Sequence, residues 1–460
     1  HLLFSLMKSK IVCLSKNNEF KEILKGKKKS NRYFTIFFKK LSNKNKDKLN
    51  ISFITKKKIV TGNAGDLIVF DGRTLHSTDY NNQHQFMAIL NPNLDVKWYI
   101  VSIDNKGWDF KVNNNDKLTY FSKLTDGWTP SGGGVWYMMN DHMQEVDTLE
   151  CVNGFEADYH DIQYTESGGY LLQAYAKEVI DIPQTNGIDS VNILVIQEFD
   201  QNHNLVFEWK NSDHMDIQDY IPSLNLNAET INWTHGNSIE IDGDYIIISN
   251  RAMSEVIKYN RFSGDVLWTL GGPLNDFVFI DDPLSGPHLQ HDTRRLQNGN
   301  LMIFDNGHGS IDGEVRAARI TEYELDETNL TATLVWEYSH PEEYVALNQG
   351  SSQRLTNGNT LISWGTVGNN YGAIITEVTY DKEIVLEIEY PTGCFSYKVR
   401  KENWEFDINL IEGDINLDGL IDVLDLIIAV NFILGNDENA PFHLYKIDLN
   451  KDGEIDILDL

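Results

Sequence analysis

Short apolar segments separated by tight turns dominate the chain from about residue 86 to 390, and no long stretch there repeats its apolar residues with a helical period of 3.6. Four segments share one pattern, in which a strand, a tight glycine turn and a second strand follow one another. These segments begin at His160, His235, His291 and Ser351. The pattern predicts a mainly β domain.

The four segments recur at a period that is typical of repeat folds. Their starts lie between 56 and 75 residues apart, and a second aromatic phrase recurs between them at Trp209, Trp268 and Trp336. All-strand units of this size favour a β-propeller built from four-stranded blades. A domain of roughly 300 residues fits five to six such blades, and we place the predicted propeller at residues 87–402.

In a propeller, the strands nearest the axis begin at one mouth of the central channel, so residues at equivalent positions of successive blades converge there. His160, His235 and His291 occupy one such position in successive units. A set of histidines that cap turns is the alternative interpretation. The nearby arginines favour a site.

Charge divides the chain into two unlike parts. Residues 1–58 contain 17 Lys+Arg against three acidic residues, whereas the whole chain has a formal net charge of −29. A strongly basic segment is typical of proteins that meet nucleic acid or an anionic membrane, and an acidic body is repelled by both. The two parts are therefore not expected to serve one task.

The basic segment resembles the start of the bacterial ribonuclease P protein subunit. The resemblance rests on an expected helix at 17–24 and expected strands at 33–38 and 50–54, but the arginine-rich helix of that family is absent after Lys58. A lysine-rich solvated arm is the alternative. We expect residues 1–58 to be a foreign fragment, so RNA is an expected partner only if they belong to the protein.

Residues 59–86 are expected to form a short β hairpin or linker. The phrase GDLIVFDGRTLH weakly resembles the last strand pair of phytanoyl-CoA-type iron dioxygenases, in which His76 would match an iron ligand. Such a site needs two histidines and a carboxylate, and no HxD partner precedes His76. An ordinary hairpin is the favoured interpretation.

The repeated phrases of the β body resemble those of the bacterial arylsulfate sulfotransferases. The resemblance is carried, in chain order, by HDIQ at His160, HGNSI at His235, SNR at Arg251, NGNLMIFDNG after His291, RAARI at Arg319 and LVWEY at Trp336. It implies a six-bladed propeller with its site in the channel. It also implies transfer of a sulfuryl group from a phenolic sulfate ester to a phenol, so that aryl sulfates and phenols are the expected small-molecule partners.

The same resemblance implies the site residues. His235, His291 and Arg319 are the expected catalytic residues, and His160 and Arg251 the expected substrate-binding residues. A transferring sulfuryl group spreads charge over three oxygens, which preorganised cationic donors stabilise. No GxxxxGK[ST] phosphate loop occurs, so no nucleotide cofactor is expected.

One position departs from the family pattern. The nucleophilic histidine of the family precedes a Tyr-Arg pair in the last blade, and the matching stretch at 393–400 has Ser396 at that place. His308 and His340 are alternative nucleophiles without a supporting spacing. A non-catalytic propeller that serves as a binding or scaffold module therefore remains the alternative function.

Two acidic loops repeat near the C-terminus, at 413–425 and 447–459. Their side-chain oxygens fall at loop positions 1, 3, 5, 9 and 12, with a backbone carbonyl at position 7 and glycine at position 6, which suits calcium. The expected ligands are Asp414, Asn416, Asp418, Leu420, Asp422, Asp425, Asp448, Asn450, Asp452, Glu454, Asp456 and Asp459. An acidic solvated tail would not explain two loops at one spacing.

The loops resemble type I dockerin repeats, because position 12 is Asp rather than the Glu of EF-hands. Residues 413–460 are accordingly expected to form a small α-helical, Ca²⁺-binding module, with a helix after Asp425. The resemblance implies a cohesin-type partner, an association with polysaccharide-degrading assemblies, and a secreted, periplasmic or cell-surface location. We expect the chain to be a fragment whose native signal peptide is missing, and no apolar run suggests a membrane span.

Overall fold

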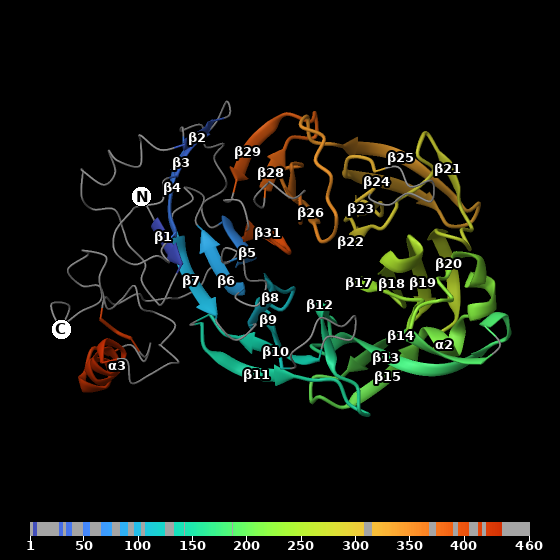
Figure 1. Cartoon of the computed structure of the whole chain (residues 1–460), viewed down its shortest axis with the longest axis horizontal. Coiled ribbons are helices and arrows are strands. Elements are labelled where there is room, and N and C mark those ends of the chain that lie inside the picture. Colours follow the sequence, from blue (N-terminus) through green and yellow to red (C-terminus); the bar gives the residue numbers. More distant parts are fainter. Residues whose placement is uncertain are drawn as a thin grey trace.

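The main body of the molecule is a ring of β-sheets around a central axis, as Figure 1 shows. The computed structural model describes residues 3–6, 27–30, 34–38, 49–55, 66–75, 83–90, 96–102, 106–124, 133–141, 143–185, 187–307, 315–367, 374–389, 394–403, 413–415 and 420–434. Strands dominate these residues, which confirms the mainly β prediction.

The ring begins and ends in one sheet, which joins strands from both ends of the β body. Its members are β5 (Asp66–Leu75), β6 (Gln83–Leu90), β7 (Val96–Ser102), β30 (Cys394–Phe395) and β31 (Val399–Asn403). β31 runs antiparallel to β5 from the pair Val399–Phe70 to the pair Asn403–Asp66. The hairpin of β5 and β6, most of which lies in the segment expected to be a hairpin or linker, therefore pairs with the C-terminal end of the β body. His76 lies outside the described residues.

The next sheet combines two groups of strands. The first group is β8 (Lys106–Val112), β9 (Leu118–Lys123), β10 (Gly134–Met139) and β11 (Glu145–Leu149). The second is β12 (Ala157–Tyr164), β13 (Tyr170–Ile182), β14 (Gly187–Phe199), β15 (Leu205–Lys210) and the short β16 (Ile231–Asn232). A single residue pair, Gly134–Ala157, joins the two groups. Neighbouring strands within each group are antiparallel, except that β16 runs parallel to β14.

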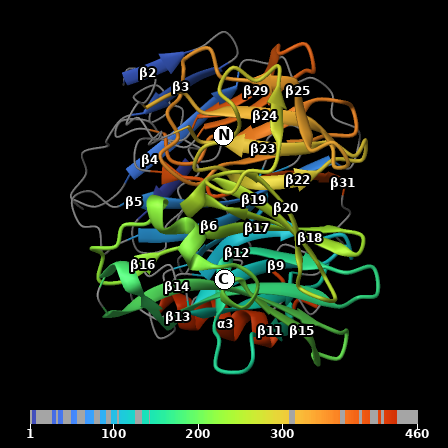
Figure 2. The same ribbon diagram turned by 90° about the vertical axis from the view of Figure 1, so that its right-hand side faces the viewer.

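Three further sheets complete the ring, and their members follow in chain order. The first consists of β17 (Gly236–Asp242), β18 (Tyr245–Asn250), β19 (Glu255–Asn260) and β20 (Val266–Gly271). The second consists of β22 (His291–Arg295), β23 (Leu301–Asp305), β24 (Arg319–Asp326), β25 (Thr331–Tyr338) and the short β21 (Val278–Ile280) beside β25. The third consists of β26 (Ser351–Arg354), β27 (Thr360–Ser363), β28 (Ile374–Val378) and β29 (Ile384–Glu389). Figure 2 shows β17, β18 and β19 side by side in their sheet. The first strand of each sheet lies nearest the axis in Figure 1.

Helical segments in the described part are short and lie between strands or after the ring. They are η1 (Pro183–Thr185), α2 (Asn211–His214), η2 (Ile217–Ser223), η3 (Arg251–Met253) and α3 (Val423–Ile433). The helix α3 overlaps the segment predicted to be helical after Asp425. No helix of the described residues has the length and apolarity needed to cross a membrane.

The N-terminal segment contributes a sheet of its own, in the order β1 (Leu3–Leu6), β4 (Leu49–Thr55), β3 (Phe34–Phe38) and β2 (Lys27–Ser30). The strands expected at 33–38 and 50–54 correspond to β3 and β4. The helix expected at 17–24 lies outside the described residues.

The recurring tryptophans fasten each sheet to the next one. Each lies on the fourth strand of its sheet and donates its indole N–H to the turn that precedes the fourth strand of the following sheet. The bonds run from Trp209 to the Gly264 carbonyl at 3.0 Å, from Trp268 to Glu327 at 3.0 Å and from Trp336 to the Tyr380 carbonyl at 2.8 Å. The periodic aromatic motif of the sequence therefore marks contacts between sheets, where the buried ring packs and its N–H finds a hydrogen-bond partner.

The inner strands are linked by a second repeated contact. A side-chain oxygen on one inner strand accepts the backbone N–H of the next inner strand around the axis. The four bonds are Ile239 N to Asp161 Oδ2 (2.9 Å), Thr293 N to Ser238 Oγ (3.0 Å), Ser352 N to Asp292 Oδ2 (2.9 Å) and Val399 N to Ser351 Oγ (3.2 Å). The last bond reaches β31, so the C-terminal strand closes this series.

Buried charges continue the linkage around the axis, and we call the six residues Asp109, Lys111, Asp161, Asp292, Arg294 and Arg400 the charge ring. Arg294 Nη2 lies 2.8 Å from both Asp161 Oδ2 and Asp292 Oδ1, and Arg400 Nη2 lies 2.7 Å from Asp292 Oδ1. Lys111 pairs with Asp161 and, at 2.8 Å, with Asp109. Burial alone would raise the pKa of Asp161, but the charges of Arg294 and Lys111 hold that pKa well below its usual range.

Substitution of one carboxylate of the charge ring should destabilise the whole ring of sheets. In Asp292→Asn, the guanidinium groups of Arg294 and Arg400 lose their shared anion in a buried site. Breaking a buried pair in this way costs about 3–5 kcal/mol, which urea denaturation of the full chain measures. Asp381→Asn, on an exposed turn, is the matched control and should leave the midpoint unchanged. A loss of less than about 1 kcal/mol for Asp292→Asn, the range of exposed pairs, would contradict the role given to the charge ring.

Candidate functional site

Three histidines meet where the inner strands begin. His160 lies on β12, His235 directly precedes β17 and His291 opens β22. The Nε2 atoms of His160 and His235 are 3.3 Å apart, and their rings meet edge to face with centroids separated by 5.0 Å. His291 is tied to this pair through Arg251 and residues 347–349. The backbone N–H of Arg251 donates to the His235 carbonyl, the Arg251 side chain donates to the Leu347 carbonyl, and the Gln349 N–H donates to His291 Nε2, so the three histidines form one cluster.

Arg251 is the cation of this cluster. It opens η3 after β18, and its backbone N–H donates to the His235 carbonyl at 2.8 Å. Its Nη2 donates to the Leu347 carbonyl at 3.3 Å, whereas its buried Nε has no hydrogen-bond partner among the described residues. Arg251 therefore brings a positive charge and a spare donor to the histidines.

Arg319, which the sequence assigned to the catalytic set, does not join them. It lies on β24, the third strand of its sheet, and is buried. Its five N–H donors are occupied by the carboxylates of Asp282, Asp305 and Glu337 and the carbonyl of Gly286. The order of motifs along the chain does not reveal which strand of a sheet faces the axis. In the structure, Arg251 rather than Arg319 lies beside the histidines.

The hydrogen bonds of His291 fix where its proton lies. The amide nitrogen of Asn306 donates to the carbonyls of Gln349 (2.9 Å) and Ala346 (3.3 Å), so the amide oxygen of Asn306 faces His291. That oxygen lies 2.7 Å from His291 Nδ1, which must therefore carry the hydrogen. The lone pair is left on Nε2, whose one described contact is a long one of 3.3 Å from the Gln349 backbone N–H.

Both His235 and His291 are held neutral. Burial lowers the pKa of His235 well below its usual value, and the charges of His160 and Arg251 lower it further. Burial and the charge of Arg251 lower the pKa of His291 in the same way, against a smaller opposing effect of the bond to Asn306. A neutral imidazole with a free nitrogen can act as a nucleophile or a base.

Aromatic rings surround His160. Tyr159 stacks on the imidazole with centroids 4.1 Å apart, and Tyr175 and Tyr397 meet it edge-on at 6.3 and 6.0 Å. Tyr159 also packs on Trp108 at 4.4 Å. The histidines are thus bordered by flat apolar surfaces that suit a phenyl ring.

Two other residues considered as nucleophiles, Ser396 and His340, are buried to about the same degree as His291, which has 3% of its surface exposed. Ser396 is buried, with 1% of its surface exposed. His340 is buried and lies 2.9 Å from the carboxylate of Glu387. His308 lies outside the described residues.

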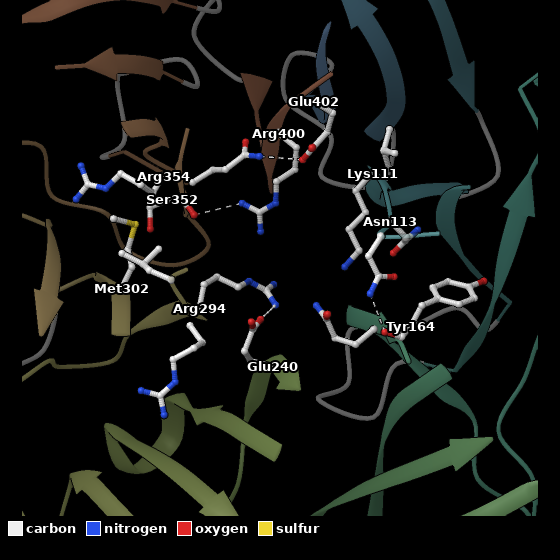
Figure 3. Close-up of a pocket in the computed structure, with 16 residues that line it drawn as sticks. Lys111, Asn113, Tyr164, Glu240, Arg294, Met302, Ser352, Arg354, Arg400 and Glu402 are labelled. Carbon is white, nitrogen blue, oxygen red and sulfur yellow. Dashed lines mark hydrogen bonds and ion pairs between the residues drawn. The ribbon is translucent and has the colours of Figure 1, made fainter. Parts of the chain in front are cut away.

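A cavity of about 260 Å³ lies at the opposite ends of the inner strands. Figure 3 shows Lys111, Arg294 and Arg400, which belong to the charge ring, around it together with Glu240 and Glu402. Burial raises the pKa of Glu240 to about 7, with the charges of Asp161 and Asp292 acting in the same direction. The histidine cluster and this cavity therefore lie at different ends of the inner strands.

The first acidic loop is described only in part. Asp425 accepts the backbone N–H of Ile415 at 2.5 Å and that of Asp422 at 2.9 Å, so its carboxylate joins the start of the loop to its end. Asp414 and Leu420 also lie in the described part, whereas Asn416, Asp418 and the whole second loop lie outside it. Within the described residues, no group of three or more metal-ligating side chains is gathered. The oxygen donors that are described nevertheless suit calcium.

Comparisons with known families match the β body and the C-terminal acidic loops to two different families. Residues 42–398 match the family described as Arylsulfotransferase (ASST), and residues 412–460 match the type I dockerin domain. The first match begins inside the basic segment 1–58. No support is found for the expected ribonuclease P resemblance or for a foreign fragment at that end.

A curated relative is the arylsulfate sulfotransferase AssT of Escherichia coli O6:H1, which is 27% identical over 205 residues. The match covers 34% of this chain and 33% of the relative, so this chain spans about a third of the length of that protein. Solved structures with a similar fold include the Cps50 (Swd1) β-propeller domain of Myceliophteria thermophila, at 8% identity, a TM-score of 0.36 and coverage of 68% and 83% of the two chains. The Dos1 propeller matches at 8% identity, a TM-score of 0.33 and coverage of 68% of each chain.

The lowered pKa values of His235 and His291 give the stability of the protein a pH dependence of known sign. An unfolded histidine binds a proton near pH 6.5, whereas these two bind it only at lower pH when folded. Their contribution is therefore full above about pH 6.5 and is lost as the pH falls towards their folded pKa values.

The double variant His235→Asn, His291→Asn should lose part of this dependence, by up to about 1.4 kcal/mol per pH unit for each histidine. Urea denaturation between pH 7.5 and 5.5 measures the slope. The surface variant Val179→Thr changes no titratable group, so it is the control and should keep the wild-type slope. Equal slopes for the double variant and the wild type would contradict the neutral state of the two histidines.

Proposed function

Because the chain belongs to the arylsulfotransferase (ASST) family, we propose that it transfers a sulfuryl group from a phenolic sulfate ester to a phenol, without a nucleotide donor. One observation carries the proposal, namely that His160, His235, His291 and Arg251 converge at the start of the inner strands. The four-strand groups around the axis support a reading of the ring as six blades, the first of which is completed by β31.

His291 is the proposed nucleophile. Its Nδ1 hydrogen is held by Asn306, and its Nε2 carries the lone pair. Attack of Nε2 on the sulfur of the ester breaks the bond between sulfur and the phenolic oxygen, and the electron pair of that bond leaves with the oxygen. The sulfuryl group then rests on His291 until the oxygen of an acceptor phenol attacks it and releases the nitrogen. Under this proposal, a histidine at position 396 is not needed.

Arg251 is the proposed anchor of the sulfuryl oxygens. Charge-assisted hydrogen bonds from a guanidinium to anionic oxygens are strong, and the buried Nε of Arg251 has no other described partner. His235 and His160 lie beside Arg251 in the same cluster. Tyr159 and Tyr175 border the same histidines and would pack against the phenyl ring.

The type I dockerin domain at 412–460 supports a second, separate role. Domains of this type bind calcium, and we propose that this one docks on a cohesin-type module when its two loops hold calcium. Such docking supports a location outside the cytoplasm, either secreted, periplasmic or at the cell surface, and an association with polysaccharide-degrading assemblies.

A non-catalytic propeller that binds aryl sulfates is the alternative, and the serine at position 396 favours it. The two functions differ in turnover. A binding module would take up the ester and release it unchanged.

Substitution of His291 should separate these functions. His291→Asn should lower the turnover of 4-nitrophenyl sulfate with phenol as acceptor by roughly 1,000-fold or more, because it removes the attacking nitrogen. Ser396→Ala and the surface variant His203→Asn should keep the wild-type rate. Release of 4-nitrophenol measures all three. A wild-type rate in His291→Asn, or its loss in Ser396→Ala alone, would show that the nucleophile is misassigned, and absence of turnover in the wild type would leave the binding module.

Calcium should order the dockerin part of the full chain. The expected ligands of each loop are mainly carboxylates, which repel one another without a metal, so metal binding supplies folding free energy. Helical circular dichroism should therefore rise on addition of calcium and fall with a chelator. Asp425→Ala should weaken the response, because Asp425 joins the two ends of its loop, and Asp326→Asn should not. Identical spectra with calcium and with chelator would contradict this role.

A further inference from the structure

The histidine cluster contains one buried carboxylate that the proposed reaction has not used. Asp158 lies on β12, two residues before His160, and is fully buried. Its Oδ1 accepts the backbone N–H of His160 at 3.0 Å and the side-chain amide of Gln173 at 2.7 Å. The same oxygen lies 2.5 Å from His160 Nδ1, and this contact is the one ion pair that Asp158 makes among the described residues.

An isolated buried carboxylate is costly, so Asp158 needs a positive partner. Tyr175 and Tyr397 cannot supply one. A tyrosine hydroxyl is neutral or anionic and never cationic, and burial raises the pKa of both hydroxyls well above the usual value, so both are neutral. The imidazole of His160 is the ion-pair partner that touches Asp158, and the relay proposed below therefore places a hydrogen on both nitrogens of His160.

The second hydrogen of His160 points at His235. His160 Nε2 is 3.3 Å from His235 Nε2, and only one of these two nitrogens can carry the hydrogen between them. Because His235 is held neutral, its Nε2 accepts, and its own hydrogen lies on Nδ1. His235 is only partly buried, and its Nδ1 is neither bonded to a described residue nor among the buried unsatisfied atoms, so it is open to the site.

We propose that Asp158, His160 and His235 form a proton relay for the phenolic oxygen, an inference that rests on the proposed function. His235 is the catalytic residue of the relay, and Asp158 and His160 are positioning residues. When the sulfur–oxygen bond breaks, the phenolic oxygen takes the Nδ1 hydrogen of His235. His235 Nε2 then takes the hydrogen of His160 Nε2, and His160 keeps its bond to Asp158.

The second half of the reaction runs the relay in reverse. The acceptor phenol gives its proton to His235 Nδ1 as its oxygen attacks the sulfuryl group on His291, and the proton between the histidines returns to His160 Nε2. Protons and electron pairs balance over the cycle without a further reactant. The other charged or titratable groups that face the pair are Arg251, His291, Tyr159, Tyr175, Tyr397 and Lys398.

The dependence of the rate on the leaving group tests the relay. A phenolate that is a poor leaving group needs the proton, whereas an electron-poor phenolate leaves without it. Asp158→Asn should therefore lower kcat/KM for phenyl sulfate by roughly 100-fold or more, the usual contribution of general acid catalysis, and lower that for 4-nitrophenyl sulfate far less. The matched control is Asp147→Asn, since Asp147 pairs with His203 at 3.3 Å on the surface and should affect neither donor. Equal losses on both donors would overturn the relay, because a purely structural role does not distinguish leaving groups.

The proton positions can also be read in the wild-type protein, should Asp158→Asn not fold. Nitrogen-15 shifts of the histidine rings should show His160 protonated on both nitrogens and His235 protonated on Nδ1 alone. A hydrogen on Nε2 of His235 would overturn the relay. Failure of the proposed function looks different, because the wild type would then turn over neither donor whatever the ring shifts show.

Discussion

Buried opposite charges around the axis are the interaction on which the rest of the structure depends. The charge ring takes its members from four inner strands, and it includes Arg400 on the strand that returns from the C-terminal end of the β body. Such charges are stable in a protein interior only when each is paired and hydrogen-bonded. The aspartates meet this condition twice, because Asp161 and Asp292 bind both a cation and the backbone N–H of the next inner strand. The ring of sheets and its charges therefore form together.

The same aspartates position the histidines. His160 directly precedes Asp161, and His291 directly precedes Asp292. An aspartate that is fixed by two neighbours determines the register of its strand, so the preceding histidine is also fixed at the start of that strand. This arrangement places the cationic Arg251 beside the neutral His235 and His291, and so provides a site for an anion inside a protein of net charge −29. Burial of the Asp158 carboxylate costs free energy, and its contact with the His160 imidazole offsets part of that cost.

Much of this arrangement can be predicted from the sequence, because a repeated sequence motif indicates a repeated structural position. The phrases that begin at His160, His235 and His291 predict the strands and their common end, and the tryptophan phrase marks the outer strands. The pairing of β5 with β31 joins residues that are more than 300 positions apart, and no local pattern carries that information. Arg251 and Arg319 both follow a histidine within a repeated phrase, and only the fold tells which of them faces the axis. Position 396 is a candidate only through the Tyr-Arg motif of the family. Which nitrogen of His291 carries the lone pair depends instead on Asn306, which lies 15 residues after His291.

The central claim is that His291 carries the sulfuryl group between donor and acceptor, and it can be tested by locating that group. The full chain would be mixed with 4-nitrophenyl sulfate in the absence of acceptor, quenched within a turnover, digested under alkaline conditions that preserve phosphoramidate-like bonds, and analysed by peptide mass spectrometry. We predict a sulfuryl adduct on the peptide that contains His291, which disappears when phenol is added before the quench. An adduct on the peptide that contains Ser396, or turnover with no adduct on any histidine, would contradict the account.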